Sequence, residues 1–373
     1  MITHDCTRYV ELVSFVTEEN STAKSGWFLD RYFRDRRTTA EKLEFRKYTK
    51  STPTPLFYGG VCLPPHLIKS GTEHLTMQDL SFPVIKAETQ ITGCDVDERR
   101  ITPKGEIIPV GKARFDDAFK NNMAEVLGGL RMTHISEAVS LLKTGSYVLH
   151  TSESKDDGTI DYGRAEELAY IDLTGTDQDW CDACVKPMNT IAAIIRNMGK
   201  YQATAGTIDI IYSPLAWEAL VAHAERDGIK FAERPPQELY DQQVLGYSDV
   251  QYMGSTNGGK FNHWLSYAEY KDYKGEIVPV VDDGEIMIIS KAAFDGQRVF
   301  RTVTSDNAEQ LSDGQNFFVY DDLDKEYNRK CRSFNPWIEE YHIMTASNIN
   351  AAVTVKVVSE DCDLCLTCNK DEQ

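Results

Sequence analysis

The chain has 373 residues, of which 41% are apolar and 26% are charged, and its 58 acidic and 40 basic residues give a formal net charge of −18. This balance predicts a folded protein with two or three structural units and excludes an intrinsically disordered chain. The excess of acids also argues against sequence-independent binding to nucleic acid, because such binding depends on Lys and Arg neutralising phosphates.

The first twenty residues interrupt every apolar run with a charged residue, so they do not supply the apolar segment of a signal peptide. No segment approaches the run of about 18 apolar residues that a membrane helix needs. We therefore expect a protein that is kept in a cytoplasm, has no membrane partner and begins with a loosely structured arm.

A short amphipathic helix is expected next, because Phe28, Leu29, Tyr32 and Phe33 fall near one side of a helix while most of the charges fall on the others. A strand should follow, since Leu43 and Phe45 alternate with charged residues. The arginine run between them is typical of a solvated face.

Proline is concentrated between Pro53 and Pro109, which predicts extended chain with few ladder hydrogen bonds. Val61–Leu63 and Phe82–Ile85 suggest a two-stranded ribbon with Lys69–His74 at its tip. An isolated ribbon is marginal in water, so this one must lean on another surface. The sequence offers no obvious partner for it within the chain.

Apolar residues recur at three- and four-residue steps from Phe115 to Leu142, which predicts one long helix that stops at Thr144-Gly145. A hairpin should follow, because alternating residues flank the turn signal Asp157-Gly158. From about residue 176, strands alternate with helices. Pro187–Met198 is predicted as a helix, and Ser213 and Pro214 are placed to cap another. These patterns favour an α+β protein.

The sequence contains no recognisable catalytic or cofactor-binding motif, so we expect neither an enzyme nor a bound cofactor. "GEIIPVGKA" imitates a phosphate-binding loop but has the wrong glycine spacing and lacks the metal-binding hydroxyl. None of the eight His lies at metal-ligand spacing from another.

Cysteine spacing gives the one metal hypothesis. Cys362, Cys365 and Cys368 form C-x-x-C-x-x-C in the acidic tail, and Cys181 and Cys184 form a separate C-x-x-C. A zinc site needs four ligands and the tail provides three, so a fourth would come from the second motif or from another chain. A disordered tail, or oxidation between neighbouring chains, is the alternative.

At Ile160-Asp161-Tyr162-Gly163-Arg164 the sequence resembles the lambda-type major capsid proteins of tailed bacteriophages, the phage major capsid protein E family. Three further segments resemble the same family in the same order: "WFLDRYFRDRRTTAEKLEF", "IIYSPLAWEAL" and "EYHIMTASNINAAVTVKVV". The resemblance implies the Hong Kong 97-type capsid fold, with a projecting loop, a peripheral domain containing a long spine helix, and an axial domain.

The boundaries implied are an N-terminal arm at 1–49, an extended loop at 50–112, the peripheral domain at 113–175, the axial domain at 176–335, strands returning to the peripheral domain at 336–361, and a Cys-rich tail at 362–373. In this fold Asp161 and Arg164 are expected to hold a strand end and a subunit contact, and Gly163 to supply a bulge or a positive φ.

The resemblance also implies a function. Copies of the chain, as hexamers and pentamers, would form an icosahedral virion shell around double-stranded DNA, assembled in the cytoplasm of a host bacterium with scaffold, portal and decoration proteins. An encapsulin-like nanocompartment and a zinc-binding module are the alternatives. Candidate subunit contacts are Arg31, Arg34, Arg36, Arg37, Lys69, Glu73, Asp161 and Arg164.

Overall fold

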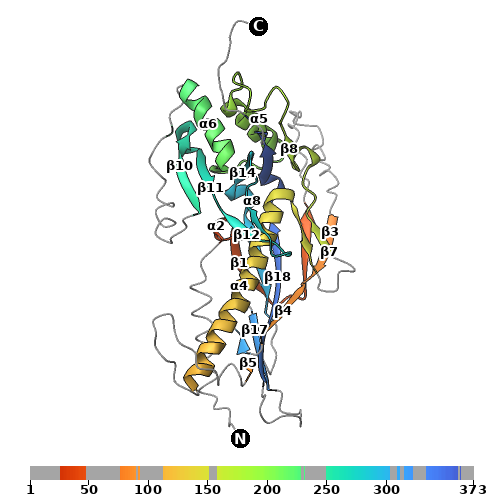
Figure 1. Cartoon of the computed structure of the whole chain (residues 1–373). Coiled ribbons are helices and arrows are strands. Elements are labelled where there is room, and N and C mark those ends of the chain that lie inside the picture. Colours follow the sequence, from red (N-terminus) through yellow and green to blue (C-terminus); the bar gives the residue numbers. More distant parts are fainter. Residues whose placement is uncertain are drawn as a thin grey trace, which may run out of the picture.

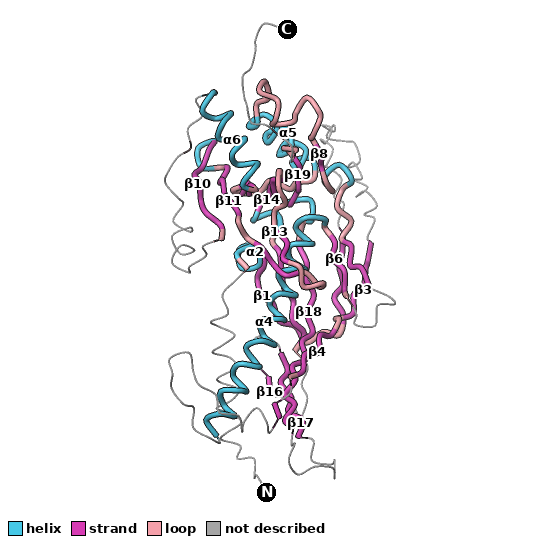
Figure 2. The backbone as a smooth tube through the Cα atoms, viewed as in Figure 1, coloured by secondary structure: helices cyan, strands magenta, loops and turns pink. Residues whose placement is uncertain are grey.

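The structure is a computed structural model that describes residues 26–47, 76–89, 91–92, 112–150, 158–227, 231, 249–302, 309–310, 315–321, 333–359 and 362. Its described part is organised by one long helix, a long sheet and a six-stranded sheet (Figure 1). The long sheet runs beside the helix in the lower half of the view, and the six-stranded sheet lies in the upper half with two further helices (Figure 2). The predicted mixture of helix and sheet is confirmed.

The long helix α4 spans Lys112–Thr144, as the apolar period predicted. Its buried side includes Met123, Leu127 and Leu141. The helix stops where expected, because Gly145 adopts a φ of 81° and donates its N–H to the carbonyl oxygen of Leu141 at 3.0 Å. Within the described residues, no helix combines the length and apolarity needed to cross a membrane.

The long sheet has the strand order β1-β15-β18-β17-β16, and β4 and β5 also pair with β18. Its strands are β1 (Phe33–Thr38), β4 (Val84–Glu88), β5 (Ile91–Thr92), β15 (Gly296–Arg301), β16 (Glu309–Gln310), β17 (Gln315–Asp321) and β18 (Ser333–Ala346). β18 is the hub, since its 14 residues pair with four other strands. Parallel pairing of β1 with β15 joins the beginning of the described chain to its last third.

The six-stranded sheet has the order β10-β11-β9-β14-β19-β8. Its strands are β8 (Ile171–Asp172), β9 (Ile208–Tyr212), β10 (Val250–Thr256), β11 (Phe261–Ser266), β14 (Glu285–Ser290) and β19 (Ala352–Lys356). Every residue of β9, β11 and β14 is buried, so these strands form the centre of the core.

Two helices lie beside this sheet, α5 (Pro187–Lys200) and α6 (Pro214–Asp227), and both were predicted. Ser213 caps α6 as expected, since its hydroxyl accepts from the N–H of Ala216 at 3.4 Å.

Shorter elements connect these layers. The helical ones are α2 (Trp27–Tyr32), η1 (Glu166–Leu168), η2 (Asn257–Gly259), α8 (Lys291–Phe294) and η3 (Ile349–Ala351). The two-stranded ones pair β2 (Lys42–Lys47) with β3 (Thr76–Ser81), β6 (Ser146–Leu149) with β7 (Gly158–Asp161), and β12 (Glu269–Lys271) with β13 (Ile277–Pro279). The β6–β7 pair is the predicted hairpin.

Three expectations, about the N-terminal helix, the ribbon and the last strands, need correction. The helix within the expected arm ends at Tyr32, and the arginine run forms β1 because it pairs with β15. Phe82–Ile85 overlaps β4, which does have a partner within the chain, namely β18. Val61–Leu63 lies outside the described residues. Finally, β18 belongs to the long sheet, but β19 joins the six-stranded sheet.

Candidate subunit-contact residues and buried ionic networks

Arg31 lies inside the subunit. The helix α2 packs Trp27, Phe28 and Leu29 into the core, and Arg31 beside them is only 8% exposed. Its guanidinium donates to both carboxylate oxygens of Asp209 in β9, at 2.8 and 3.0 Å. Burial alone would lower the pKa of Arg31, but Asp209 and Tyr32 together outweigh burial and raise it. This charge is satisfied within the chain, and the expected subunit contact at Arg31 stays a prediction.

The other arginines of this segment are at the surface. Arg34, Arg36 and Arg37 are exposed on β1, which forms one end of the long sheet among the described strands. Arg36 also donates to Gln297 Oε1 at 3.4 Å on the neighbouring strand. Lys69 and Glu73 lie outside the described residues. The arginine edge of β1 is therefore the candidate contact surface that the structure describes.

The Asp-Tyr-Gly-Arg turn organises the fold. Asp161 is exposed, and its Oδ1 accepts from the N–H of Gly163 at 2.8 Å. Gly163 has a φ of 64°, which confirms the predicted positive φ. Tyr162 donates its hydroxyl to the carbonyl oxygen of Met344 at 2.6 Å and so ties the turn to β18.

Arg164 follows the turn and closes the end of α4. Its guanidinium donates to the carbonyl oxygens of Leu141 and Leu142 at 2.9 Å and of Lys143 at 2.6 Å. These carbonyls lie in the last turn of the helix, where carbonyl oxygens run out of N–H partners within the helix, and that of Leu141 also accepts from the N–H of Gly145. Burial lowers the pKa of Arg164 to about 10. The buried guanidinium of Arg164 therefore acts at the helix end, and its expected role as a subunit contact stays a prediction.

A network of charges connects β1, β15, α4 and β18, with Asp35 exposed at one end and the His and Glu members buried. Arg298 in β15 donates to both oxygens of Asp35 at 2.8 Å, and it also donates to Nδ1 of His134 at 2.7 Å. A guanidinium has only donors, so Nδ1 of His134 must accept. The His134 proton is therefore assigned to Nε2, which donates to Glu340. Burial lowers the pKa of His134, in agreement with this neutral tautomer.

His342 in β18 is the charged member of this network. Its Nε2 donates to Glu137 at 2.6 Å, and its Nδ1 lies 3.0 Å from a Glu340 oxygen. Burial opposes a charge on His342, but the two carboxylates outweigh it and raise the pKa of His342 to about 10. The paired His residues hold the pKa of Glu340 well below its usual range despite its burial. The imidazolium of His342 is thus a structural cation between the carboxylate of Glu137 in α4 and that of Glu340 in β18.

His134, Glu340 and His342 have the residue types of a metal site, and their ligand atoms lie within 4.8 Å of one another. A metal ion would have to displace Arg298 from Nδ1 of His134 and remove the protons of His342. The guanidinium would also repel it. The hydrogen bonds therefore fit an ionic network better than a metal centre.

The sequence did not reveal this network, because its histidines are separated by more than two hundred residues. One local signal was present. His134 and Glu137 lie three residues apart on the buried side of α4, and Glu340 and His342 lie two residues apart in one strand. Polar residues that repeat at the period of a buried face indicate partners on a facing element.

An open groove of about 720 Å³ lies between α4 and the β12–β13 hairpin. Gly128 and Gly129 line it from the helix, and Tyr273 and Ile277 line it from the hairpin. A Cβ added at either glycine would meet nothing within 4 Å. The two glycines therefore keep the groove wide and are not required for packing within the described chain.

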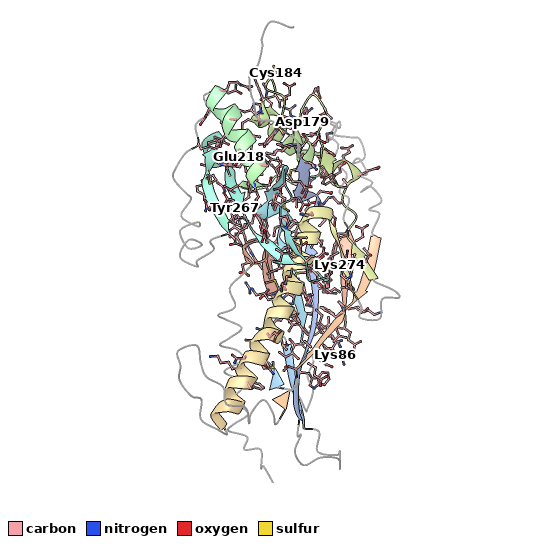
Figure 3. The ribbon with its side chains drawn as sticks, viewed as in Figure 1. Lys86, Asp179, Cys184, Glu218, Tyr267 and Lys274 are labelled. Carbon is pink, nitrogen blue, oxygen red and sulfur yellow. A yellow bond between two sulfur atoms is a disulfide. The ribbon has the colours of Figure 1, made fainter. Side chains whose placement is uncertain are left out.

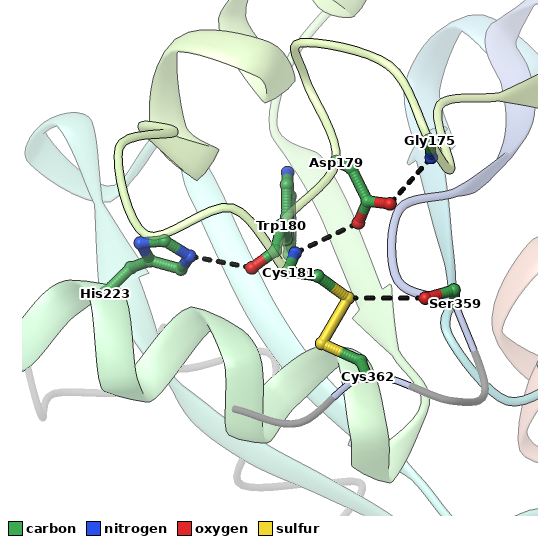
Figure 4. The surroundings of a disulfide bond; sticks show 7 residues. All are labelled: Gly175, Asp179, Trp180, Cys181, His223, Ser359 and Cys362. Atoms are coloured by element: carbon green, nitrogen blue, oxygen red, sulfur yellow. Dashed lines mark hydrogen bonds between the residues drawn. A yellow bond between two sulfur atoms is a disulfide. The ribbon is translucent and has the colours of Figure 1, made fainter. Parts of the chain in front are cut away.

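Two predicted cysteine ligands meet in the structure. Cys181 and Cys362 form a disulfide with their Cα atoms 5.7 Å apart (Figure 4). Cys184 lies at the end of the molecule that carries α5 and α6 (Figure 3) and is also disulfide-bonded. Cys365 and Cys368 lie outside the described residues.

The fold is similar to that of a solved capsid protein. The match is to a protein assigned as the capsid protein of a prophage in Escherichia coli CFT073, with a TM-score of 0.63, 11% sequence identity, and coverage of 93% of this chain and 98% of that one. The SrpI encapsulin of Synechococcus elongatus PCC 7942 aligns less closely, with a TM-score of 0.45, 9% identity, and coverage of 91% of this chain and 89% of that one. A chain of Mycobacterium phage Patience aligns with a TM-score of 0.45, 8% identity, and coverage of 95% and 89%.

The architecture is therefore the Hong Kong 97-type capsid fold. The family model for phage major capsid protein E matches residues 18–330, so the chain belongs to that family. It is a shell-forming major capsid protein, and the family is structural and not enzymatic. No curated protein matches the chain.

Proposed function

We propose that copies of the chain assemble as hexamers and pentamers into an icosahedral shell that encloses the double-stranded DNA genome of a tailed bacteriophage. Assembly takes place in the cytoplasm of the host bacterium, with scaffold, portal and decoration proteins as partners. The observation that carries this proposal is the family match, which spans the spine helix α4, β1 and nearly all of the six-stranded sheet. The net charge of −18 suits a wall that contains DNA without adsorbing it.

The domain names also remain proposals, with two changes that the sheet topology supports. Residues 27–38 join the body of the subunit, since α2 lies in the core and β1 pairs with β15. Residues 352–356 join the axial domain, since β19 pairs with β14 and β8. The remaining boundaries stay as the sequence suggested.

The proposed subunit contact is the arginine edge of β1, formed by Arg34, Arg36 and Arg37. Exposed arginines on an end strand can approach acidic groups of a neighbouring copy, which the excess of acids makes abundant. Such exposed ion pairs contribute roughly 0–1 kcal/mol each, so they set the register between copies more than the strength of the shell. The further candidates are still Arg31, Asp161, Arg164, Lys69 and Glu73.

Expression of the full chain, alone and with its scaffold protein, tests the shell. We expect closed particles in negative-stain microscopy and fast-sedimenting material, with nuclease-protected DNA in particles from infected cells. A chain that stays monomeric with its scaffold would contradict assembly. Protected cargo protein in place of DNA would show a nanocompartment.

Charge reversal tests the contact surface. Arg34→Glu combined with Arg36→Glu should leave a folded subunit, by far-UV circular dichroism, that no longer forms particles. Lys260→Glu, which reverses one exposed charge on the turn between β10 and β11, is the control and should assemble normally. Normal particles from the double variant would exclude this edge as a contact.

A further inference from the structure

The groove between α4 and the β12–β13 hairpin has two consecutive glycines on its helix side. Gly128 and Gly129 lie in the middle of α4, where glycine is the least favourable residue after proline. A Cβ at either position would meet nothing within 4 Å, so no contact within the described chain requires glycine there. Glycine at such a place leaves the helix backbone open to close approach by another chain.

The hairpin side of the groove presents large apolar side chains to solvent. Ile277 is 65% exposed and Tyr273 is 46% exposed, and both line the groove. Among the described residues, Ile277 is the most exposed of the large hydrophobic side chains. Exposed apolar groups that gather around a hollow are typical of a surface that a partner covers.

The polar side chains of the groove favour arginine in that partner. Glu125 from the helix and Glu269 from the hairpin are exposed, and Asp272 adds a third carboxylate, whereas the lining includes one basic residue, Lys271. Tyr270 contributes an aromatic ring to the same lining. A guanidinium donates to carboxylates and stacks on aromatic rings, so this combination suits arginine better than lysine.

The exposed arginines of β1 point away from the groove of their own copy. Side chains alternate between the two faces of a strand. Asp35 points to the α4 side of the long sheet, since its partner Arg298 also donates to His134 in α4. Arg34 and Arg36 flank Asp35 and therefore point to the opposite face. The arginines and the groove are thus two different surfaces of one subunit.

We propose that the groove of one copy receives Arg34 and Arg36 of a second copy, with their guanidinium groups on Glu125 and Glu269. This inference rests on the proposed function, because it supplies the acceptor for the arginine edge of β1. The contact is head-to-tail, since it joins two different surfaces. Head-to-tail contacts close into a ring when the rotation between copies allows it, and hexamers and pentamers are such rings.

An exchange of charges tests the pairing. Glu125→Arg combined with Glu269→Arg should prevent particles, as Arg34→Glu combined with Arg36→Glu should. The four substitutions together place opposite charges across the same contact again, so they should restore particles in sedimentation and negative-stain microscopy. Far-UV circular dichroism shows that each chain is folded. A folded fourfold variant that forms no more particles than either double variant would overturn the pairing.

Gly129→Leu tests the groove without a change of charge. Leucine favours a helix more than glycine does, so the unassembled subunit should unfold at a higher temperature, while the filled groove no longer admits a second copy. A misfolded variant would not show this combination. Ala192→Leu places leucine at an exposed position of α5 and is the control, which should assemble normally.

The outcomes separate this inference from the proposed function. Particles from Gly129→Leu, at the yield of the unmutated chain, would overturn the inference alone and assign the groove to a partner of different sequence. An unmutated chain that stays monomeric with its scaffold would contradict the shell itself, and the groove contact with it.

Discussion

Arg31 in α2 and Asp209 in β9 form a buried two-point ion pair that connects residues 178 apart in the chain. The Asp209 carboxylate also accepts from the hydroxyl of Tyr32 at 2.9 Å and from Nε1 of Trp264 at 3.2 Å. The ring of Trp264 lies 4.6 Å from the guanidinium carbon. The pair fixes the beginning of the described chain to the central strand of the six-stranded sheet.

Replacement of Arg31 by Met should destabilise the subunit by about 3–5 kcal/mol, because it leaves the Asp209 carboxylate buried without its cation. Urea unfolding of the unassembled chain measures this change. Arg131→Met is the matched control, since Arg131 forms a 2.8 Å ion pair with Asp30 that is partly exposed on both sides. The control should lose no more than about 1 kcal/mol. Equal losses of stability in the Arg31→Met and Arg131→Met variants would show that burial does not increase the contribution of the Arg31–Asp209 ion pair.

Replacement of Arg164 by Met should cost about 3 kcal/mol, since it removes a charged donor from three carbonyl oxygens at the end of α4. Hydrogen exchange should accelerate in the last turn of the helix and in the β6–β7 hairpin. Arg164→Lys keeps the charge but not the forked geometry, so it should recover only part of the stability. Full recovery by Lys would mean that charge alone closes the helix.

Sequence patterns correctly predicted the helices, helix ends and caps that are determined by residues close together in the chain. The period of α4, its stop at Gly145 and the cap at Ser213 each depend on a few neighbouring residues. β1 was missed because Arg34, Asp35, Arg36 and Arg37 give it no alternating pattern, and only pairing with β15 makes it a strand.

Dependence on distant partners also explains which site residues the sequence analysis missed. The partner of Arg31 is Asp209, and the partner of His134 is Glu340, both far along the chain. Charges on a helical segment predict solvent exposure unless a distant counter-charge is buried with them. The meeting of Cys181 with Cys362 likewise depends on the pairing of β19 with β14 and β8, which the sequence did not specify.

Gly284 should be far less tolerant of Ala than Gly129. Gly284 has a φ of 75°, and a Cβ there would lie 2.1 Å from the carbonyl oxygen of Val358. We expect Gly284→Ala to cost about 2 kcal/mol or more, and to loosen the segment that leads to Cys362. Gly129 lies inside α4 with open space around its Cα, so Gly129→Ala should stabilise the subunit by about 0.5–1 kcal/mol. Thermal unfolding compares the two, and a tolerated Gly284→Ala would contradict the tight contact with Val358.

The imidazolium of His342 predicts a loss of stability at alkaline pH. Its nearest groups are the carboxylates of Glu137 and Glu340 and the neutral ring of His134, with Arg298 beyond that ring. The carboxylates raise the pKa of His342 to about 10, from an ordinary value near 6.5. A group whose pKa is raised on folding contributes its full stabilisation at pH values below its pKa in the unfolded chain. That contribution is lost as the pH rises from the unfolded pKa through the folded pKa.

Between pH 7 and pH 9 the unfolded chain has released the proton of His342 while the folded chain still holds it. The free energy of unfolding should therefore fall by up to about 1.4 kcal/mol per pH unit from this residue alone. His342→Gln should lower stability at pH 7 and flatten the slope over this range, because it carries no titrating proton. His150→Gln, at an exposed histidine, should keep the original slope. Urea unfolding at pH 7, 8 and 9 measures all three chains, and an unchanged slope in His342→Gln would show that His342 is neutral in the folded subunit.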